Sequence, residues 1–118
     1  MIIAIDFDGV LVEDAFPDIG NPDWDMVSAV WKLGFTDHEL ILWTSRVDDK
    51  LNEAIQWCHD HDLKFASINA NTPSNLAQYG TDPRKCYADV YVDDRAFGYN
   101  RTRALIYLNQ LFTDKEEK

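Results

Sequence analysis

The chain begins with a strand pattern that ends in acidic residues. Its first residues are Met1-Ile-Ile-Ala-Ile-Asp6-Phe-Asp8-Gly9-Val10, and apolar, mostly β-branched side chains fill the run up to Asp6. A short apolar run of this kind is typical of a strand that is buried on both faces of a parallel sheet. Such a strand has no polar face, so its chemistry must lie at its carboxyl end, where open α/β sheets bind ligands. We therefore expect a sheet whose first strand delivers Asp6 and Asp8 to a binding edge.

Strand and helix patterns alternate along the rest of the chain. The expected elements are strands at 40–43, 65–68 and 88–92, helices at 22–34, after Asp48 or Asp49, and at about 102–112, and an irregular stretch at 69–83. Asn21 is the expected cap of the first helix, and Asp48 or Asp49 is that of the second. Repeated strand–helix units predict a parallel sheet between helices. The predicted fold class is α/β: a single-domain, three-layer α/β/α sandwich with a Rossmann-like sheet.

Composition and charge limit the classes of protein that fit. The 118 residues are 46% hydrophobic and 27% charged, which is ordinary for a globular domain with a buried core. The net charge of −10 disfavours nucleic acid as a partner, because that surface needs clustered Lys and Arg. Cys58 and Cys86 lack metal-ligand spacing, and we expect reduced thiols rather than a disulfide. The apolar run that Asp6 interrupts is too short for a signal peptide or a membrane span, which favours a cytoplasmic location.

Three of the four expected strands end in residues suited to catalysis. Asp6 and Asp8 follow the first strand, Thr44 follows the second, and Asp93 and Asp94 follow the last. Parallel strands place these tips on one edge, where the four carboxylates would repel one another unless a cation lay among them. Oxygen ligands alone favour Mg²⁺ over Zn²⁺. The sequence therefore predicts a magnesium site at this edge.

Three further residues can supply polar contacts at this edge. Lys85 precedes the last strand and can add positive charge. Ser45 and Arg46 follow Thr44 and can bind a substrate phosphate, for which arginine provides bidentate contacts. Arg46 fits equally well as a helix-start or ion-pair residue.

The polar residues occur in an order that resembles a known family. Asp6-Phe-Asp8-Gly9-Val10, Thr44, Lys85 and Asp93-Asp94 resemble, in order, the four motifs of the haloacid dehalogenase (HAD) superfamily. The stretch 85–95 is especially similar to small HAD-type proteins of bacteria and their phages. The resemblance implies a HAD-like catalytic core at 1–112, followed by a charged C-terminal tail at 113–118. The segments between the motifs leave no room for a cap domain, so we expect an open site.

The resemblance also implies an activity, that of a Mg²⁺-dependent phosphatase acting on phosphomonoesters. Asp6 would be the nucleophile that forms an aspartyl-phosphate, and Asp8 would be the general acid and then the general base. Thr44 would bind a phosphoryl oxygen, and Lys85 would pair with both Asp6 and the phosphoryl group. The implied metal ligands are the Asp6 carboxylate, the Asp8 main-chain carbonyl, the Asp94 carboxylate, and Asp93 directly or through water.

The substrate and two rival functions stay open at this point. The expected partner is a phosphorylated small molecule, such as a nucleotide or sugar phosphate, or a phosphoprotein; no membrane is expected, and the chain is a monomer or homodimer. One rival is a degenerate, non-enzymatic metal-binding module, although every catalytic position carries suitable chemistry. The other is a receiver-like phosphoacceptor domain. A receiver has its acidic pair after the first strand and its phosphorylated Asp later, which is the reverse of the order seen here.

Overall fold

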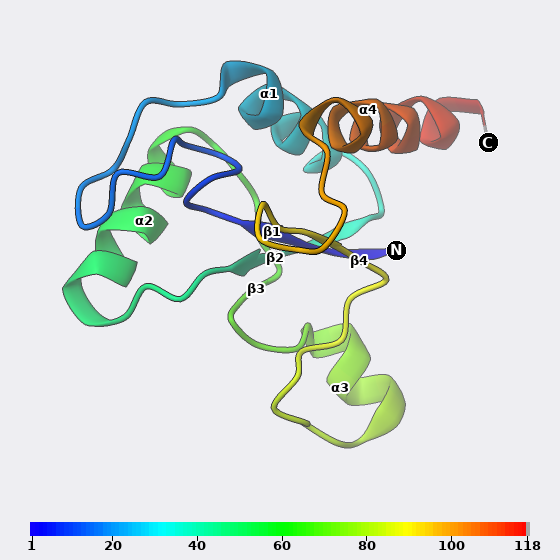
Figure 1. The fold of residues 1–118 in the computed structure, drawn as a ribbon. Coiled ribbons are helices and arrows are strands. Elements are labelled where there is room, and N and C mark those ends of the chain that lie inside the picture. Colours follow the sequence, from blue (N-terminus) through cyan, green and yellow to red (C-terminus); the bar gives the residue numbers. More distant parts are fainter. Residues whose placement is uncertain (118) are drawn as a thin grey trace.

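The sheet has four parallel strands in the order β3-β2-β1-β4. The computed structural model describes the backbone of residues 1–117 and the side chains of residues 1–114. The strands are β1 (Ile2–Asp6), β2 (Glu39–Trp43), β3 (Ser67–Ile68) and β4 (Val90–Val92), and the helices are α1 (Trp24–Leu33), α2 (Asp48–Asp60), α3 (Pro73–Tyr79) and α4 (Arg101–Glu117). Helices lie on both sides of the sheet (Figure 1). The predicted three-layer α/β/α sandwich is confirmed.

The two faces of the sheet are covered unequally. Side chains alternate along a strand, so Ile3 and Ile5 of β1 face one side and Ala4 faces the other. Ile3 and Ile5 belong to the large core, which also contains side chains of α1, α2 and α4. Ala4 belongs to a smaller cluster with Cys86 and Ala88, on the side where Figure 1 shows α3. Most of the apolar burial therefore lies on the face that carries three helices.

The strand order reverses at β1. The chain passes outward from β1 through β2 to β3, and then returns to place β4 on the other side of β1. Ile5 is paired with Val92, so the carboxyl ends of β1 and β4 lie next to each other. Open α/β sheets bind ligands at the carboxyl ends of the strands, where the strand order reverses. The topology thus brings together the polar residues that follow β1 and β4.

Helix α1 begins two residues later than the sequence pattern predicted. Asp23, rather than Asn21, is the N-cap, and its side chain accepts a hydrogen bond from the Met26 backbone N–H at 3.3 Å. Pro22 is instead paired with Val12 in an antiparallel bridge, which keeps it outside the helix. The tertiary contact overrides the preference of proline for the first position of a helix.

Helix α2 differs from expectation at its cap. The N-cap position is Val47, which provides no side-chain hydrogen bond, and Asp48 and Asp49 lie in the first turn. Carboxylates in the first turn still interact favourably with the positive end of the helix dipole. The predicted cap was therefore wrong in position, although the acidic residues are at the correct end of the helix.

The stretch at 69–83, expected to be irregular, contains helix α3. The Thr72 side chain accepts a hydrogen bond from the Asn75 backbone N–H at 3.2 Å, and Pro73 is the first residue of the helix. Gly80, with a left-handed φ of 69°, ends the helix. The pattern of apolar residues did not predict α3, because the helix is short and most of its residues are exposed. Its boundary residues, Thr72 and Gly80, were the better indication of a helix.

The ends of several elements also differ from the predicted bounds. Strands β3 and β4 are shorter than the predicted 65–68 and 88–92, as each lies at an edge with a single neighbouring strand. The predicted tail at 113–118 continues α4 as far as Glu117, and residue 118 lies outside the described residues. Within residues 1–117, no helix is both long enough and apolar enough to cross a membrane.

Both cysteines are free, buried thiols, as expected. Cys58 lies in the large core and Cys86 in the smaller cluster on the other face of the sheet. Burial raises the pKa of the Cys58 thiol to about 12. The sheet between them explains why the two sulfur atoms are not joined.

Candidate functional site

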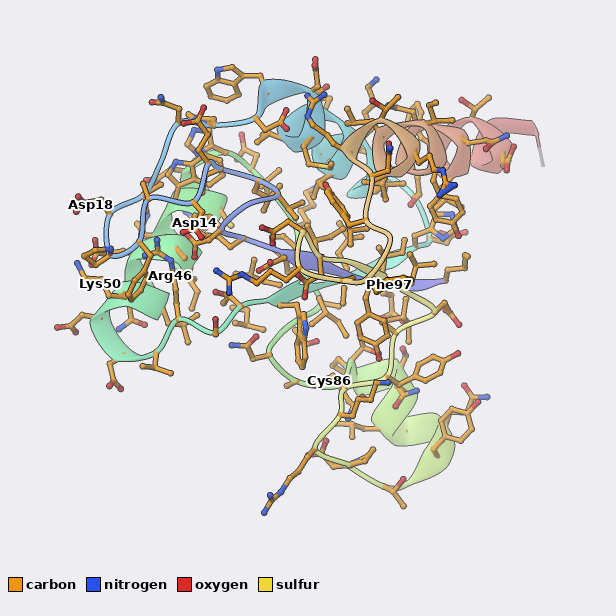
Figure 2. All side chains as sticks on the ribbon, in the orientation of Figure 1. Asp14, Asp18, Arg46, Lys50, Cys86 and Phe97 are labelled. Carbon is orange, nitrogen blue, oxygen red and sulfur yellow. The ribbon has the colours of Figure 1, made fainter. Side chains whose placement is uncertain are left out.

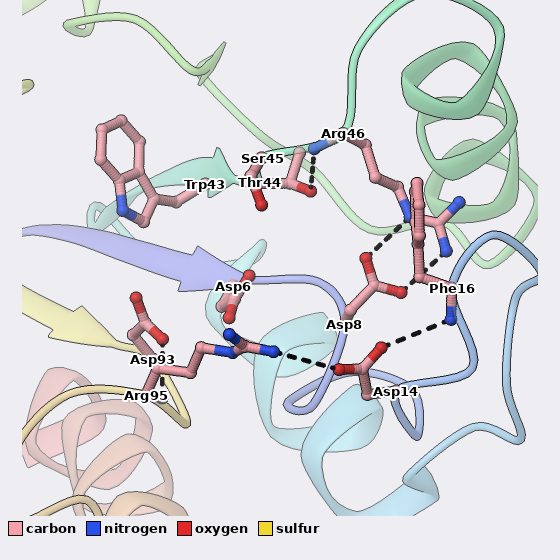
Figure 3. Close-up of a pocket in the computed structure, with 10 residues that line it drawn as sticks. All are labelled: Asp6, Asp8, Asp14, Phe16, Trp43, Thr44, Ser45, Arg46, Asp93 and Arg95. Carbon is pink, nitrogen blue, oxygen red and sulfur yellow. Dashed lines mark hydrogen bonds and ion pairs between the residues drawn. The ribbon is translucent and has the colours of Figure 1, made fainter.

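A cavity of about 540 Å³ lies at the carboxyl edge of the sheet (Figure 3). It is lined by Asp6, Asp8, Asp14, Phe16, Trp43, Thr44, Ser45, Arg46, Asp93 and Arg95. Its volume is in the range of sites for small molecules. Of the predicted site residues, Asp6, Asp8, Thr44, Ser45, Arg46 and Asp93 line the cavity, and Asp94 belongs to the acidic cluster beside it.

The acidic cluster consists of Asp6, Asp93 and Asp94. One carboxylate oxygen from each residue lies within 4.8 Å of the other two. Burial of Asp6, a hydrogen bond with Asp94 and the negative charge of Asp93 together raise the pKa of Asp6 to about 8. Without a cation, the cluster therefore relieves part of its repulsion by holding a proton on Asp6 near neutral pH.

The Asp94 side chain has the environment of a cation ligand. Within the described residues, its Oδ1 atom is buried and has no hydrogen-bond partner. A buried oxygen without a partner is costly, and a metal ion would provide the missing interaction. Gly9 makes the placement possible, because its φ of +89° suits glycine and a Cβ atom there would collide with the Asp94 carboxylate. The three carboxylates could thus hold a hard cation such as Mg²⁺.

Asp8 is held by Arg46 rather than by the acidic cluster. The Nε and Nη2 atoms of Arg46 donate hydrogen bonds to the Oδ2 and Oδ1 atoms of Asp8, at 2.7 and 2.8 Å. The Arg46 side chain is only 1% exposed and that of Asp8 17%. This two-pronged contact fixes the orientation of the Asp8 carboxyl group.

The remaining donors of Arg46 are bound to backbone carbonyls. Nη2 also donates to the Asp18 carbonyl at 2.8 Å, and Nη1 makes longer contacts to Pro17 at 3.4 Å and Lys50 at 3.5 Å. Figure 2 shows Arg46 between the loop that carries Asp14 and Asp18 and helix α2, which carries Lys50. Arg46 therefore joins Asp8 to this loop. It has the predicted ion-pair role, and the alternative of binding substrate phosphate would require these contacts to break.

Thr44 and Ser45 follow β2 and reach the cavity from the side opposite β4. The Thr44 hydroxyl oxygen accepts a hydrogen bond from the Arg46 backbone N–H at 3.1 Å, which leaves its hydrogen free to be donated to another acceptor. The Thr44 backbone N–H donates to Asn69 Oδ1 at 2.8 Å. Asn69 adopts a left-handed φ of 49°, which asparagine tolerates better than most residues. Sequence reasoning missed this contact because no pattern links positions 44 and 69.

Lys85 is the predicted site residue that the structure does not bring to the cavity. It is exposed, and its Nζ atom lies 5.6 Å from the centre of the Tyr91 ring. Its neighbour Cys86 is buried in the cluster on the α3 face of the sheet. Because Cys86 is buried there, the preceding Lys85 points to the surface. The number of residues between Lys85 and β4 does not predict this direction.

Four lining residues were not predicted: Asp14, Phe16, Trp43 and Arg95. Arg95 could have been found, since it follows the Asp93-Asp94 pair directly. Its Nη2 atom lies 3.6 Å from Asp14 Oδ2. Asp14 and Phe16 lie on the loop that Arg46 holds, and the path of this loop is not encoded in any local pattern.

Comparison with known proteins gives one informative match. No protein-family model matches the chain, and no curated protein does. A solved structure of a conserved protein encoded by a locus of Bacteroides thetaiotaomicron is 37% identical, with a TM-score of 0.78, and the match covers 100% of this chain and 92% of that one. This identity over the full length shows common descent as well as a shared fold. The chain belongs to the same family as this conserved Bacteroides thetaiotaomicron protein.

Proposed function

We propose that the protein is a Mg²⁺-dependent phosphomonoester hydrolase of the HAD type, with Asp6 as its nucleophile. The observation that carries the proposal is the cluster of Asp6, Asp93 and Asp94, in which a buried Asp94 oxygen has no partner among the described residues. This cluster adjoins a cavity that Asp8 and Thr44 also line. The order of these residues along the chain, and its resemblance to the HAD motifs, supports the same function.

The acidic cluster would hold the metal through the carboxylates of Asp6, Asp93 and Asp94. Bound there, Mg²⁺ would neutralise the negative charge of the cluster and of the phosphoryl oxygens. The Thr44 hydroxyl would donate its hydrogen to a phosphoryl oxygen. These contacts supply the positioning and charge neutralisation on which phosphoryl transfer mainly depends.

The reaction would proceed in two steps through Asp6. In the first, a carboxylate oxygen of Asp6 bonds to phosphorus, the bond from phosphorus to the leaving oxygen breaks, and Asp8 gives that oxygen a proton. In the second, water attacks phosphorus and Asp8 accepts its proton, which releases inorganic phosphate and restores the Asp6 carboxylate. Two steps make a weak carboxylate nucleophile sufficient.

Arg46 would position Asp8 for both steps. The two hydrogen bonds from Arg46 would hold the Asp8 carboxyl group in one orientation while it accepts a proton from water in the second step. The proton gained in one turnover is then available to the leaving group of the next. A general acid and base of this kind contributes about 10²–10⁴-fold to the rate.

Hydrolysis of p-nitrophenyl phosphate tests the proposal. We expect turnover with Mg²⁺, none with EDTA, background activity in Asp6→Asn, and a decrease of about 10²–10⁴-fold in Asp8→Asn. Full activity of Asp6→Asn would contradict the mechanism. Mg²⁺ binding without turnover would favour the non-enzymatic module, and phosphorylation of Asp6 by acetyl phosphate without release would favour a receiver-like phosphoacceptor.

The natural substrate is proposed only by class, as a phosphorylated small molecule or a phosphoprotein. Within residues 1–117, the β1–β2 connection contains α1 and the β2–β4 connection contains α2, β3 and α3, so neither connection holds a separate folded cap. The exposed Phe16 and the half-buried Trp43 give the cavity two aromatic walls. Screening a panel of phosphorylated metabolites and phosphopeptides would identify the substrate.

A further inference from the structure

The two arginines of the cavity differ in how firmly they are held. Arg46 is buried and bonded through all its N–H groups. The side chain of Arg95 is 83% exposed, and its guanidinium lies 3.6 Å from Asp14. That separation is longer than the 2.7–2.9 Å or so of a charge-assisted hydrogen bond between these groups. Arg95 can therefore exchange its partner at little cost, whereas Arg46 cannot.

The charges around the cavity leave a specific need for such a cation. The lining contains four aspartates, Asp6, Asp8, Asp14 and Asp93, and two arginines. Arg46 is neutralised by Asp8, and a divalent cation would neutralise most of the acidic cluster. A phosphate ester adds further negative charge beside Asp6 and Asp93. Lys85, which the sequence pattern offered as the balancing charge, lies over Tyr91.

We propose that Arg95 binds the phosphoryl oxygens of the substrate, and that Asp14 holds Arg95 at the cavity while no substrate is bound. This inference rests on the proposed phosphatase function. When a phosphate ester enters, the guanidinium exchanges its long contact with Asp14 for bidentate contacts with two phosphoryl oxygens, which match its planar geometry. No covalent bond changes in this exchange.

The position of Asp14 supports this arrangement. Its loop is fastened by the Arg46 contacts to the carbonyls of Pro17 and Asp18. The Asp14 Oδ1 atom also accepts a long hydrogen bond, 3.4 Å, from the Phe16 backbone N–H. Figure 3 shows Arg95 extending toward Asp14 from the β4 side of the cavity. Asp14 is thus the held partner and Arg95 the long, exposed side chain that can move.

Steady-state kinetics with p-nitrophenyl phosphate and Mg²⁺ test the assignment. We expect Arg95→Met to lower kcat/KM by about 10- to 100-fold, the value of a lost charged hydrogen bond, mainly through a higher KM. Arg95→Lys should be intermediate, because it keeps the charge and loses the forked geometry. Asp14→Asn should lower KM by about 2- to 5-fold, since it removes the competing partner of Arg95. Arg103→Met, the same change on α4, should match the wild type.

An unchanged KM in Arg95→Met would overturn the assignment. So would a decrease of about 10- to 100-fold in kcat/KM that occurred in Lys85→Met and not in Arg95→Met. Calorimetric titration with inorganic phosphate, in the presence of Mg²⁺, separates this inference from the proposed activity. If the wild type has no turnover, weaker phosphate binding in Arg95→Met and tighter binding in Asp14→Asn still support an anion site at Arg95. Equal affinity in all variants, or no phosphate binding by the wild type, would refute it. Circular dichroism confirms that each variant is folded.

Discussion

Burial and two neighbouring carboxylates together raise the pKa of Asp6. Its pKa is raised from 3.8 to about 8, first by burial and then by Asp94 and Asp93. A raised carboxyl pKa means that the folded protein holds a proton that the unfolded chain releases. The stability that this proton contributes is complete below about pH 4 and is lost as the pH rises through about 8.

The variant Asp6→Asn isolates this effect because asparagine does not titrate. In metal-free buffer at pH 8, we expect Asp6→Asn to have a higher free energy of unfolding than the wild type. The difference should shrink steadily as the pH falls toward 4, and urea denaturation in EDTA at several pH values measures it. A difference that did not vary with pH would show that Asp6 keeps an ordinary pKa.

Gly9 gives a second prediction at the level of one residue. Gly9→Ala introduces a Cβ atom at a φ of +89°, where it meets the Asp94 carboxylate. The backbone strain alone costs about 1–2 kcal/mol, and displacement of Asp94 should also weaken Mg²⁺ binding. Gly98→Ala is a matched control, because Gly98 has a φ of +81° with nothing within 4 Å of the added atom. Thermal denaturation should show destabilisation in both variants, whereas Mg²⁺ affinity should fall only in Gly9→Ala.

The sequence predicted residues at strand tips better than residues held by loops. Asp6, Asp8 and Thr44 could be placed because a buried strand must carry its chemistry at its end. The partner of Arg46 could not be placed, because it depends on how residues 14–18 fold back over Asp8. The position of Lys85 could not be predicted either, because the direction of its side chain depends on the burial of the next residue, Cys86.

Among the elements, α1 and α4 are linked at their N-terminal ends by ion pairs of Arg101 with Asp23 and Asp25. Asp23 caps α1 and also accepts two hydrogen bonds from Arg101, at 2.7 and 2.8 Å, at the start of α4. The Arg101 hydrogen bond lowers the pKa of Asp23. The lowered pKa stabilises the folded protein at pH values above the pKa of Asp23 in the unfolded chain. This stabilisation is lost as the pH falls through the lower pKa of Asp23 in the folded protein.

Asp23→Ala should therefore destabilise the protein by about 1–2 kcal/mol at neutral pH, the cost of a lost helix cap with its partner. Asp23→Asn keeps the cap and should lose less. Asp25→Ala removes a single, more exposed contact of Arg101 and should cost less than about 1 kcal/mol. Urea denaturation at pH 7 and pH 3 measures how much each of the three variants is destabilised and how that loss depends on pH. Equal effects of Asp23→Ala and Asp25→Ala would contradict the joint role of Asp23.

The elements themselves were predictable where they bury an apolar face. Helices α1, α2 and α4 were expected from their periodic apolar residues, and each contributes to the large core. Helix α3 was missed because its boundary residues, Thr72 and Gly80, were the main signal. Periodic apolar residues predict helices that pack against a core, whereas a short helix that buries little apolar surface is predicted only from its cap residues.

At the scale of the whole molecule, the site follows from topology. Strand–helix alternation alone predicted a parallel sheet, and a parallel sheet places every strand tip on one edge. The strand order was not predictable from local patterns, yet it is what sets β4 beside β1 and so brings Asp93 and Asp94 to Asp6. The function proposed here depends on that one adjacency.

Calorimetric titration with Mg²⁺ near pH 7 tests this adjacency most directly. We expect binding at a single site, with a heat that depends on the buffer because Asp6 releases a proton as the metal binds. Asp94→Asn should weaken the affinity by at least about tenfold, by the loss of a charged ligand, whereas Asp37→Asn, an exposed acidic residue outside the cluster, should bind as the wild type does. Absence of Mg²⁺ binding by the wild type, or equal affinity in Asp94→Asn, would contradict the account.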